Sequence, residues 1–373
     1  MSKKRRIAIL GCGGMGSGHA RAIGGKGDYT TNFLSYDPYM PGQIEITDLS
    51  DKLELAGIYD IDEKRMAWAS EMGWRCYESY EAILADPDVD IVLIAVPNDL
   101  HYDFTLQAMR AGKHVLCEKP VMMNSAELED VIKVSKETGM VFYPRQNRRW
   151  DMDFQIIKKI LDEGMLGDVY CIESRCMGSR GIPGDWRAKK EHGGGMMMDW
   201  GVHMLDRMLI MVQEKIKSVY CNFTYVTSEE CEDGFKALLT FESGKTALVE
   251  VGTCNFINLP QWYVCGNEGT VYIKDSTCEG KMILLKQWDE PDVQPILAGE
   301  GLTKTMAPRD ESTITDAQLP AIVVDRNALY TNLVDTINGD AKQIVTAEQA
   351  LRVLRLMETC FESDRTNKVV PFE

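Results

Sequence analysis

The sequence contains no apolar run long enough to cross a membrane, and it has fewer basic than acidic side chains. Lys and Arg number 41 and Asp and Glu 57, so the formal net charge is −16. A surface of this sign repels phosphate backbones and anionic membranes, so we expect neither nucleic acid nor a membrane as partner. The start MSKKRR is typical of a signal peptide, but only IAIL follows before glycines interrupt it. That run is too short for a secretory signal, and a cytoplasmic protein is predicted.

Paired cysteine motifs are also lacking. The 11 cysteines are scattered between Cys12 and Cys360 without a Cys-x-x-Cys pair. This pattern argues against a disulfide framework and a zinc site, and it favours reduced thiols in a cytosol. There is no internal repeat or low-complexity tract. The 45% hydrophobic and 26% charged residues are typical of a globular protein, and 373 residues suffice for two domains.

The first 145 residues alternate apolar strands with amphipathic helices. The expected strands are RRIAILG, LELAGIYD, DVDIVLIAVP, KHVLCEKP and MVFYPR. A helix follows each of the first four strands, and the last of these is expected to begin at Ser125 as N-cap. Continuous apolar strands separated by helices predict an α/β fold with a parallel sheet covered on both faces.

From about residue 146 the pattern changes to alternating strands. They include GDVYCIESRCM, SVYCNFTYVT, WYVCGNEGTVYIKD and KMILLKQW, and FESGKTALVE predicts a hairpin that turns at Ser-Gly. Two helices close the chain, RNALYTNLVDTINGD and AEQALRVLRLMETCFESDR. We therefore expect a largely antiparallel open sheet with helices on one face.

A glycine-rich loop lies between the first strand and the first helix. Gly11, Gly13 and Gly16 form the pattern G-x-G-x-x-G, and Gly14 and Met15 complete the loop. The first glycine permits a tight turn, the second lets a pyrophosphate approach the backbone, and the third lets the helix pack closely on the strand. The helix N-terminus then offers unpaired N–H groups to that phosphate. These five residues are predicted to bind a dinucleotide cofactor.

An acidic residue at the end of the second strand should hold the adenosine ribose. Asp37 fits the usual spacing of about 20 residues, but loop-like sequence follows it, whereas a helix and a buried strand follow Asp60. We prefer Asp60 and treat about 25–52 as an insertion. An acid there repels a 2′-phosphate and Ile61 adds no positive charge, so NAD is favoured over NADP. Arg65 is expected to be an exposed helix residue and not a phosphate clamp.

The order of these and further segments resembles the glucose–fructose oxidoreductase and myo-inositol dehydrogenase family, often written Gfo/Idh/MocA. The segments are DPDVDIVLIAVPNDLHYDFTLQAMRAGKHVLCEKP, RRWDMDF, GGGMMMDWGVHMLD and NGDAKQIVTAEQALRVLRLMETCFESDRTNKVV. The resemblance covers nearly the whole chain apart from 25–52. It implies an N-terminal Rossmann domain over 1–145 and a C-terminal α/β domain over 146–373. The second domain would bind substrate, and its sheet would form a homo-dimer or homo-tetramer.

In this family the lysine of the EKP motif lies beside the nicotinamide and the substrate hydroxyl, which implies a catalytic role for Lys119. Glu118 would fix the lysine or contact the cofactor. Rossmann folds bind ligands at the carboxyl ends of parallel strands, where Pro97 and Asn98 also lie. His101 either contacts the cofactor or only starts the following helix.

The segment DWGVHMLD carries the second half of the expected chemistry. Asp199 and His203 are four residues apart and would project from one face of a helix. The family uses this pair with the histidine as acid or base, for which its pKa is suited. A histidine that is merely satisfied by its carboxylate neighbour is the structural alternative. A metal site of His192, Asp199 and His203 lacks a compact ligand spacing, so no metal is predicted.

The resemblance implies hydride transfer between a secondary hydroxyl carbon and C4 of nicotinamide. His203 would take the hydroxyl proton, Asp199 would orient the imidazole, and Lys119 would donate to the substrate oxygen. Arg148, Trp186 and Arg187 are expected to border the substrate pocket. The substrate would be a sugar, a glycoside or an inositol, with the sugar 3-hydroxyl as one variant.

Two other functions remain open at this point. Some relatives keep NAD bound and recycle it in each turnover, with glycoside cleavage or transhydrogenation as the net result. A non-catalytic, NAD-binding regulatory protein could use the same fold. The sequence names neither the substrate nor the direction of reaction.

Overall fold

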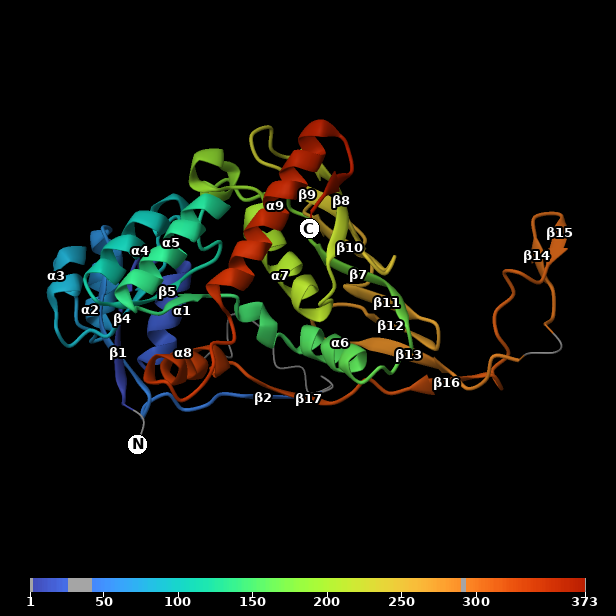
Figure 1. Ribbon diagram of the computed structural model, residues 1–373, viewed down its shortest axis with the longest axis horizontal. Helices are drawn as coiled ribbons and strands as arrows, with labels where there is room; N and C mark the ends of the chain where they lie inside the picture. Colours follow the sequence, from blue (N-terminus) through green and yellow to red (C-terminus); the bar gives the residue numbers. More distant parts are fainter. Residues whose placement is uncertain (1–2, 26–41, 290–292, 373) are drawn as a thin grey trace.

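The computed structural model describes residues 3–25, 42–289 and 293–372 (Figure 1). The first unit is a five-stranded parallel sheet in the order β3-β1-β4-β5-β6, as the alternating pattern predicts. Its strands are β1 Arg5–Leu10, β3 Leu53–Tyr59, β4 Ile91–Ile94, β5 His114–Cys117 and β6 Phe142–Pro144. Its helices are α1 Gly14–Ile23, α2 Glu63–Glu71, α3 Tyr80–Ala85, α4 His101–Arg110 and α5 Ser125–Thr138.

Both faces of this sheet are buried, which explains the continuous apolar strands. Along β1, Ile7 and Ile9 belong to one hydrophobic cluster, whereas Ala8 and Leu10 belong to another. The chain passes from β1 through β3 on one side and back to β4 on the other, so the order reverses between β1 and β4. Ligands bind at such a point in open α/β sheets.

The start of α5 differs by one residue from the expectation. Asn124, not Ser125, is the N-cap, because its side-chain oxygen accepts from the Glu127 N–H at 3.0 Å. The Ser125 hydroxyl instead donates to Glu358 of α9, at 2.7 Å. Either side chain can cap a helix, and a contact with a distant helix determines which one does.

The second unit is a nine-stranded sheet in the order β16-β13-β12-β11-β7-β10-β9-β8-β18. Only β7 and β10 pair in parallel within it, so the largely antiparallel sheet is confirmed. β9 and β10 form the predicted hairpin. The strands are β7 Val169–Met177, β8 Ile216–Thr224, β9 Gly234–Phe241, β10 Thr246–Gly252, β11 Trp262–Gly266, β12 Gly269–Ile273, β13 Gly280–Leu285, β16 Ile314–Ala317 and β18 Val370–Pro371.

Three helices cover one face of this sheet, as predicted (Figure 1). They are α6 Met152–Asp162, α7 Val202–Met211 and α9 Ala347–Thr366. α9 begins with a capping box, in which Thr346 and Gln349 bond each other's backbone N–H. α9 also packs on α5 of the first unit, so it joins the two sheets.

Helix α8, Ala328–Asn338, departs from the predicted division at residue 145. Leu329 and Leu333 share a hydrophobic cluster with Ile7 and Ile9 of β1. The helix therefore completes the core of the first unit, although it follows the second sheet in the sequence. Local sequence could not reveal this, because an amphipathic helix does not specify which of two apolar surfaces it covers.

The predicted insertion at 25–52 is described only in part. Asp37 lies outside the described residues. β2, Gly42–Glu45, pairs in parallel with β17, Ile322–Asp325, which precedes α8. The described end of the insertion is thus tied to the segment that returns the chain to the first unit.

Two further strands, β14 Ile296–Ala298 and β15 Gly301–Thr303, form a hairpin away from the main body (Figure 1). The sequence pattern had not indicated them. Among the helices of the described ranges, none is long and apolar enough to span a membrane.

Candidate active site

The glycine-rich loop has the geometry that its spacing predicts. Gly11 has φ +91°, and a Cβ there would lie 2.5 Å from the Ala95 carbonyl oxygen. A Cβ on Gly16 would lie 1.9 Å from the Gly11 carbonyl oxygen. Around Gly14 nothing lies within 4 Å of an added Cβ, and at Gly13 only the Arg65 guanidinium does. The loop is therefore tight where the backbone turns and open where a ligand would approach.

This open side fits a dinucleotide. α1 begins at Gly14, so its first N–H groups point out of the helix beside the loop. Met15 is partly exposed at the same place. A hollow of about 290 Å³ adjoins the loop, lined by Cys12, Gly13, Gly14, Ser17, Arg21, Lys64, Arg65 and Trp68.

Asp60 directly follows β3 and is buried, and it contacts Cys12, which lines this hollow. Its carboxylate accepts from the Cys12 N–H at 2.6 Å and from the Asp62 N–H at 2.9 Å. The Arg65 side chain is half exposed, as expected. Its guanidinium also lies 3.2 Å from the Asp60 carboxylate, so the two side chains are paired. With Arg21 and Lys64, Arg65 places three positive charges around the hollow. The preference for NAD over NADP stays a prediction.

Glu118 holds the end of β5 in a buried network. It accepts from His19 of α1 at 2.7 Å and pairs with Arg145 at 3.0 Å. His19 in turn bonds Tyr330 of α8 at 2.5 Å. Burial alone would raise the pKa of Glu118, but Arg145 and His19 lower it to about 2. Because Glu118 also accepts from the Lys119 N–H at 3.2 Å, it fixes the position from which the lysine side chain departs.

The Lys119 side chain crosses to the second unit. Its Nζ donates to the Asp199 carboxylate at 2.6 Å and to the Asp199 carbonyl at 2.8 Å. Arg187 Nε donates to the other carboxylate oxygen at 2.9 Å. Burial lowers the pKa of Lys119 against the opposing effect of Asp199. For Asp199, burial raises the pKa, but the two cations outweigh it and keep the pKa below its usual range.

Asp199 does not sit on the regular helix that the sequence predicts. It lies in a π-helical turn, Met197–Gly201 (η6), which runs directly into α7. Such a turn is wider than an α-turn, so positions four apart no longer align, and π-turns are frequent at functional sites. Asp199 accordingly bonds Lys119 and Arg187, and no hydrogen bond to His203 forms. The hypothesis that Asp199 orients the imidazole thus lacks the contact it needs.

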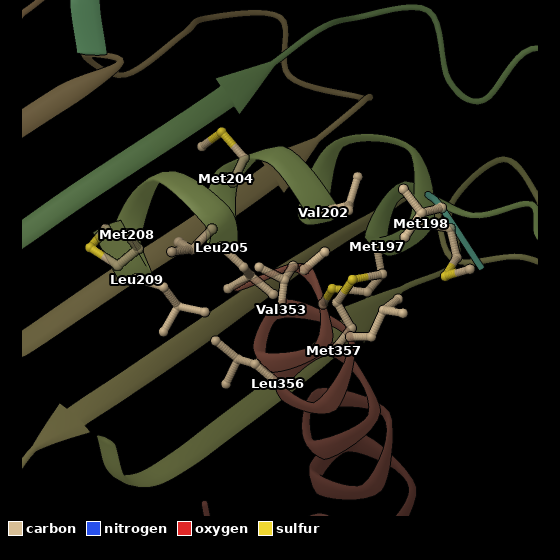
Figure 2. Packing of buried hydrophobic residues seen from close by; sticks show 14 of the residues in the cluster. Met197, Met198, Val202, Met204, Leu205, Met208, Leu209, Val353, Leu356 and Met357 are labelled. Carbon is tan, nitrogen blue, oxygen red and sulfur yellow. The ribbon is translucent and has the colours of Figure 1, made fainter. Parts of the chain in front are cut away.

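A methionine-rich core holds η6 and α7. Figure 2 shows the side chains of Met197 and Leu205 on the side of α9, whose Val353 and Met357 belong to the same buried cluster. Unbranched methionine side chains fill irregular gaps, which suits the join between a π-turn and an α-helix.

Glu232, buried in the loop before β9, anchors the start of η6. Its carboxylate accepts from the Met197 N–H at 2.9 Å, and burial raises the pKa of Glu232 to about 7.

His203 is buried on α7, four residues after the Asp199 that Lys119 contacts. Burial lowers the pKa of His203 well below its usual value, and the positive charge of Lys119 lowers it further. Its Nδ1 has no hydrogen-bond partner in the part of the chain that the structure describes. Buried polar atoms are almost always paired, so this nitrogen is suited to a group that the chain does not supply. The edge of the imidazole meets Trp200, with ring centroids 6.4 Å apart.

The three expected substrate residues surround the same turn. The Arg148 guanidinium stacks over Trp200, 4.3 Å from the ring centroid, and donates to Asp151 at 3.0 Å. Trp186 lies under the guanidinium of Arg187, with 4.5 Å between them. Their proximity to Asp199 and His203 is consistent with a substrate pocket, and their roles stay predictions.

Of the residues at the end of β4, Asn98 is buried and donates to the Gly193 carbonyl of the second unit at 3.2 Å. Pro97 precedes it and starts a short 3₁₀ turn. His101 is fully buried, with its ring nitrogens 2.9 Å and 3.0 Å from the carbonyls of Pro120 and Val96. It therefore braces the start of α4, and we do not include it among the cofactor contacts.

The alternative metal ligands have other partners. His192 lies 3.2 Å from Asp99, and Asp199 is held by two cations. Across the described ranges, no group of three or more His, Cys, Asp or Glu side chains could hold a metal ion.

Sequence reasoning missed two supporting residues, Arg145 and Glu232. Arg145 directly follows β6 at the carboxyl edge of the sheet, so the rule that identified Lys119 and Asn98 could have identified it. Glu232 lies in an acidic loop, SEECEDG, in which Glu232 and Asp233 are buried, and nothing local distinguishes them from the exposed Glu229 and Glu230.

Comparison with known proteins agrees with this arrangement. Residues 5–145 match the family model described as "Oxidoreductase family, NAD-binding Rossmann fold". Residues 154–272 match the "GFO/IDH/MocA C-terminal domain". The two matches together span more than half of the chain.

Two individual relatives extend over most of its length, and a third matches a shorter part of it. An NAD-binding protein from Listeria innocua, of known structure, is 42% identical with a TM-score of 0.87, and the match covers 99% of each chain. The scyllo-inositol 2-dehydrogenase (NADP(+)) IolW of Bacillus subtilis is 28% identical over 79% of this chain and 82% of its own. The D-glucoside 3-dehydrogenase of Escherichia coli is 33% identical over 38% of this chain and 42% of its own.

The glycine loop, the joined sheets and these matches agree on one family. The resemblance seen in the sequence is confirmed, including its fold class of a parallel Rossmann sheet followed by a mostly antiparallel sheet. The chain is a member of the Gfo/Idh/MocA family of oxidoreductases, with an NAD(P)-binding Rossmann domain at its N-terminus.

Proposed function

We propose that this protein transfers a hydride between a secondary hydroxyl carbon of a sugar, glycoside or inositol and the nicotinamide of NAD(P). One observation carries the proposal. Lys119 of the first unit lies 2.6 Å from Asp199 of the second, and its charge lowers the pKa of His203. An ammonium and a neutral imidazole are thus held together at the end of the parallel sheet where a cofactor fits.

The imidazole of His203 serves as the proton acceptor for alcohol oxidation. Its lowered pKa keeps it neutral at physiological pH, so a nitrogen lone pair is available. The buried, unpartnered Nδ1 supports this role in the described part of the molecule. In the reverse direction the same nitrogen returns the proton.

Lys119 stabilises negative charge on the substrate oxygen. Preorganised cations act most strongly in a site that excludes water, and Lys119 is largely buried. Asp199 holds the ammonium in place, and Arg187 holds Asp199 from the other side. We propose this positioning role for Asp199 in place of the imidazole-orienting role.

The cofactor belongs at the glycine loop. Gly13 and Gly14 leave room for a pyrophosphate, the N-terminus of α1 faces it, and Asp60 closes the ribose end. When bound, the nicotinamide supplies the hydride acceptor or donor. We propose NAD as the preferred cofactor because Asp60 ends β3. The cations around the hollow allow NADP as the second choice.

The substrate class rests on aromatic and cationic groups next to His203. Trp200 and Trp186 offer ring faces, and Arg148 and Arg187 offer donors for hydroxyl groups. The relatives named above act, by their names, on scyllo-inositol and D-glucosides. We therefore propose a polyhydroxylated ring as substrate, with oxidation at the sugar 3-hydroxyl as one variant.

A substrate panel tests the proposal. The purified chain is incubated with NAD or NADP and with inositols, monosaccharides and glycosides, and NAD(P)H absorbance at 340 nm is followed. We expect reduction of the cofactor by at least one polyol and none by simple primary alcohols. Binding of cofactor without turnover on any member of the panel would favour a regulatory protein.

A second candidate is a redox-neutral enzyme that keeps NAD bound and recycles it, with glycoside cleavage or transhydrogenation as the outcome. Sugar products are then measured by chromatography without added cofactor. Turnover under these conditions supports recycling, whereas strict dependence on added NAD(P) supports the dehydrogenase.

We also propose that the chain forms a homo-dimer or homo-tetramer through the free face of the nine-stranded sheet. The helices cover only the other face (Figure 1). One row of paired residues crosses the free face, and most of it is apolar. The row runs Tyr220, Leu238, Leu248, Glu173, Tyr263, Tyr272 and Lys281.

A further inference from the structure

A long excursion leaves the second sheet between β13 and β16. We call its described residues, 286–289 and 293–313, the arm. Figure 1 shows the arm extending far beyond the sheet, with the β14–β15 hairpin at its tip. The residues of the arm do not contribute to the candidate active site.

The base of the arm is an ordered structure. Lys286 N–H donates to the Thr313 carbonyl at 2.8 Å, which continues the β13–β16 pairing outward. Further out, Arg309 donates to the carbonyls of Gln287 and Trp288, each at 3.3 Å. The guanidinium also lies 5.0 Å from the centroid of the Trp288 ring. These contacts hold the two sides of the arm together and direct it away from the sheet.

The tip, in contrast, is not stable by itself. β14 and β15 have three residues each and form a sheet separate from the others. Isolated two-stranded hairpins are at best marginally stable in water. Leu297 and Leu302 are directly paired across the hairpin, and their exposed fractions are 73% and 69%. Met306 follows at 75%. A hairpin with such a surface is typical of a segment that packs on another molecule.

We propose that the tip of the arm binds a second copy of this chain, with Leu297, Leu302 and Met306 packing on that copy. The inference rests on the proposed association through the free sheet face. The arm continues from β13 and β16 at the edge of that same sheet, and in the two-fold dimer that we propose each arm packs on the other copy. The contact is thus continuous with the face that carries the apolar row.

The net charge of the chain also favours a second copy as the partner of the arm. With a net charge of −16, the chain repels nucleic acid and anionic membranes. Two copies also repel each other, so association requires apolar contacts of the kind that the arm and the free face offer. Because salt screens the repulsion, the assembly tightens as ionic strength rises.

The test uses the full chain in analytical ultracentrifugation over a range of concentrations. We expect an oligomer whose dissociation constant rises at least tenfold in the double variant Leu297→Glu, Leu302→Glu. The matched control is Val323→Glu, an exposed apolar residue of β17 outside the arm, which should leave the constant unchanged. NAD(P)H binding by fluorescence verifies that each variant is folded.

Trypsin gives a second readout. Lys304 and Arg309 are cleavage sites on the arm, and we expect protection in the native oligomer and rapid cleavage in the double variant. If the double variant does not fold, replacement of residues 295–304 by Gly-Ser-Gly is measured instead, with the same expected dissociation.

Two results overturn the proposal, and they differ in what else they exclude. An oligomer that neither arm variant weakens contradicts the role of the arm but leaves association through the sheet intact. A chain that is monomeric at all concentrations contradicts both. The substrate panel is independent of either result.

Discussion

The glycine-rich loop and the π-helical turn both present polar groups to the candidate site, but they are held in place by different means. The loop depends on its own backbone: Gly11 and Gly16 approach neighbouring carbonyls too closely for any side chain. The π-turn depends on distant partners, which are Lys119, Glu232 and the methionine-rich core on α9. A motif of the first kind can be identified from sequence, whereas one of the second kind cannot.

Breaking a buried ion pair at the start of the second unit should have the largest effect on stability. Arg149 makes two bonds to Asp206 of α7, at 2.8 and 2.6 Å, and both side chains are buried. Arg149→Met leaves Asp206 buried without its partner, which costs about 3–5 kcal/mol. Urea denaturation measures this change in the free energy of unfolding. The exposed pair of Arg355 with Glu129 is the control, and Arg355→Met should change the free energy of unfolding by less than about 1 kcal/mol.

Removal of the Lys119 ammonium should impair turnover but leave cofactor binding intact. Lys119→Met should lower kcat by roughly 10²–10³-fold, the usual cost of losing one preorganised donor. NAD(P)H should still bind, because the glycine loop does not depend on this side chain. Steady-state kinetics and fluorescence titration measure the two effects. Lys133→Met, at an exposed position on α5, is the control, and unchanged turnover in Lys119→Met would refute the proposed role.

The buried carboxylate of Glu232, which anchors the π-helical turn, makes the stability of the folded chain sensitive to pH. Its folded-state pKa of about 7 lies above the usual value of 4.5. The folded protein therefore binds the proton more tightly, so this contribution to stability is complete below pH 4.5 and lost as pH rises through about 7. Between pH 5 and pH 8 the loss amounts to at most about 3 kcal/mol.

Glu232→Gln should remove this part of the pH dependence, because the amide oxygen can still accept from Met197. Denaturation at pH 5 and pH 8 measures the difference. Glu229→Gln in the same loop, where the side chain is exposed, should follow the native profile. If Glu232→Gln follows it as well, the carboxylate does not titrate as described.

The glycine loop is tested by adding one methyl group. Gly16→Ala places a Cβ 1.9 Å from a backbone carbonyl, and such overpacking costs about 1–3 kcal/mol. We expect NAD(P)H binding to weaken at least about fivefold. Gly18→Ala, on the same helix but outside the glycine pattern, meets nothing within 4 Å and should bind nearly as the native chain does. Equal affinities of the two variants would show that close packing at Gly16 is unimportant.

The smallest effect concerns the choice of cofactor. Arg65 pairs with Asp60 at the hollow, and its side chain is half exposed. Arg65→Gln should weaken NADPH binding about two- to fivefold more than NADH binding, because exposed ion pairs contribute at most about 1 kcal/mol. Titrations of both cofactors test this, and an equal loss for the two would place Arg65 away from a 2′-phosphate.

Several features could be predicted from local sequence. The Rossmann strands, the glycine loop, the β9–β10 hairpin and the two closing helices follow from periodicity and turn residues. The flanking pattern also identified the second strand of the sheet, and Asp60 directly follows it, while its role toward the cofactor stays a prediction. Lys119 and His203 were proposed from the resemblance, and in the folded chain the positive charge of Lys119 contributes to the lowered pKa of His203.

Other features could not be predicted in this way. The partner of Asp199 is an ammonium 80 residues away and not the nearby imidazole, because a π-turn changes the spacing on the helix face. Helix α8 covers the first sheet, and the arm leaves the second. Neither is encoded in a local pattern, since each depends on which surfaces remain uncovered elsewhere.

The sequence by itself determined the elements and the cofactor loop, because hydrophobic period and glycine geometry act over a few residues. Only the tertiary structure decided which charges meet. The ammonium of Lys119, the carboxylate of Asp199 and the imidazole of His203 influence one another through burial and short distances, and both depend on how the two sheets pack.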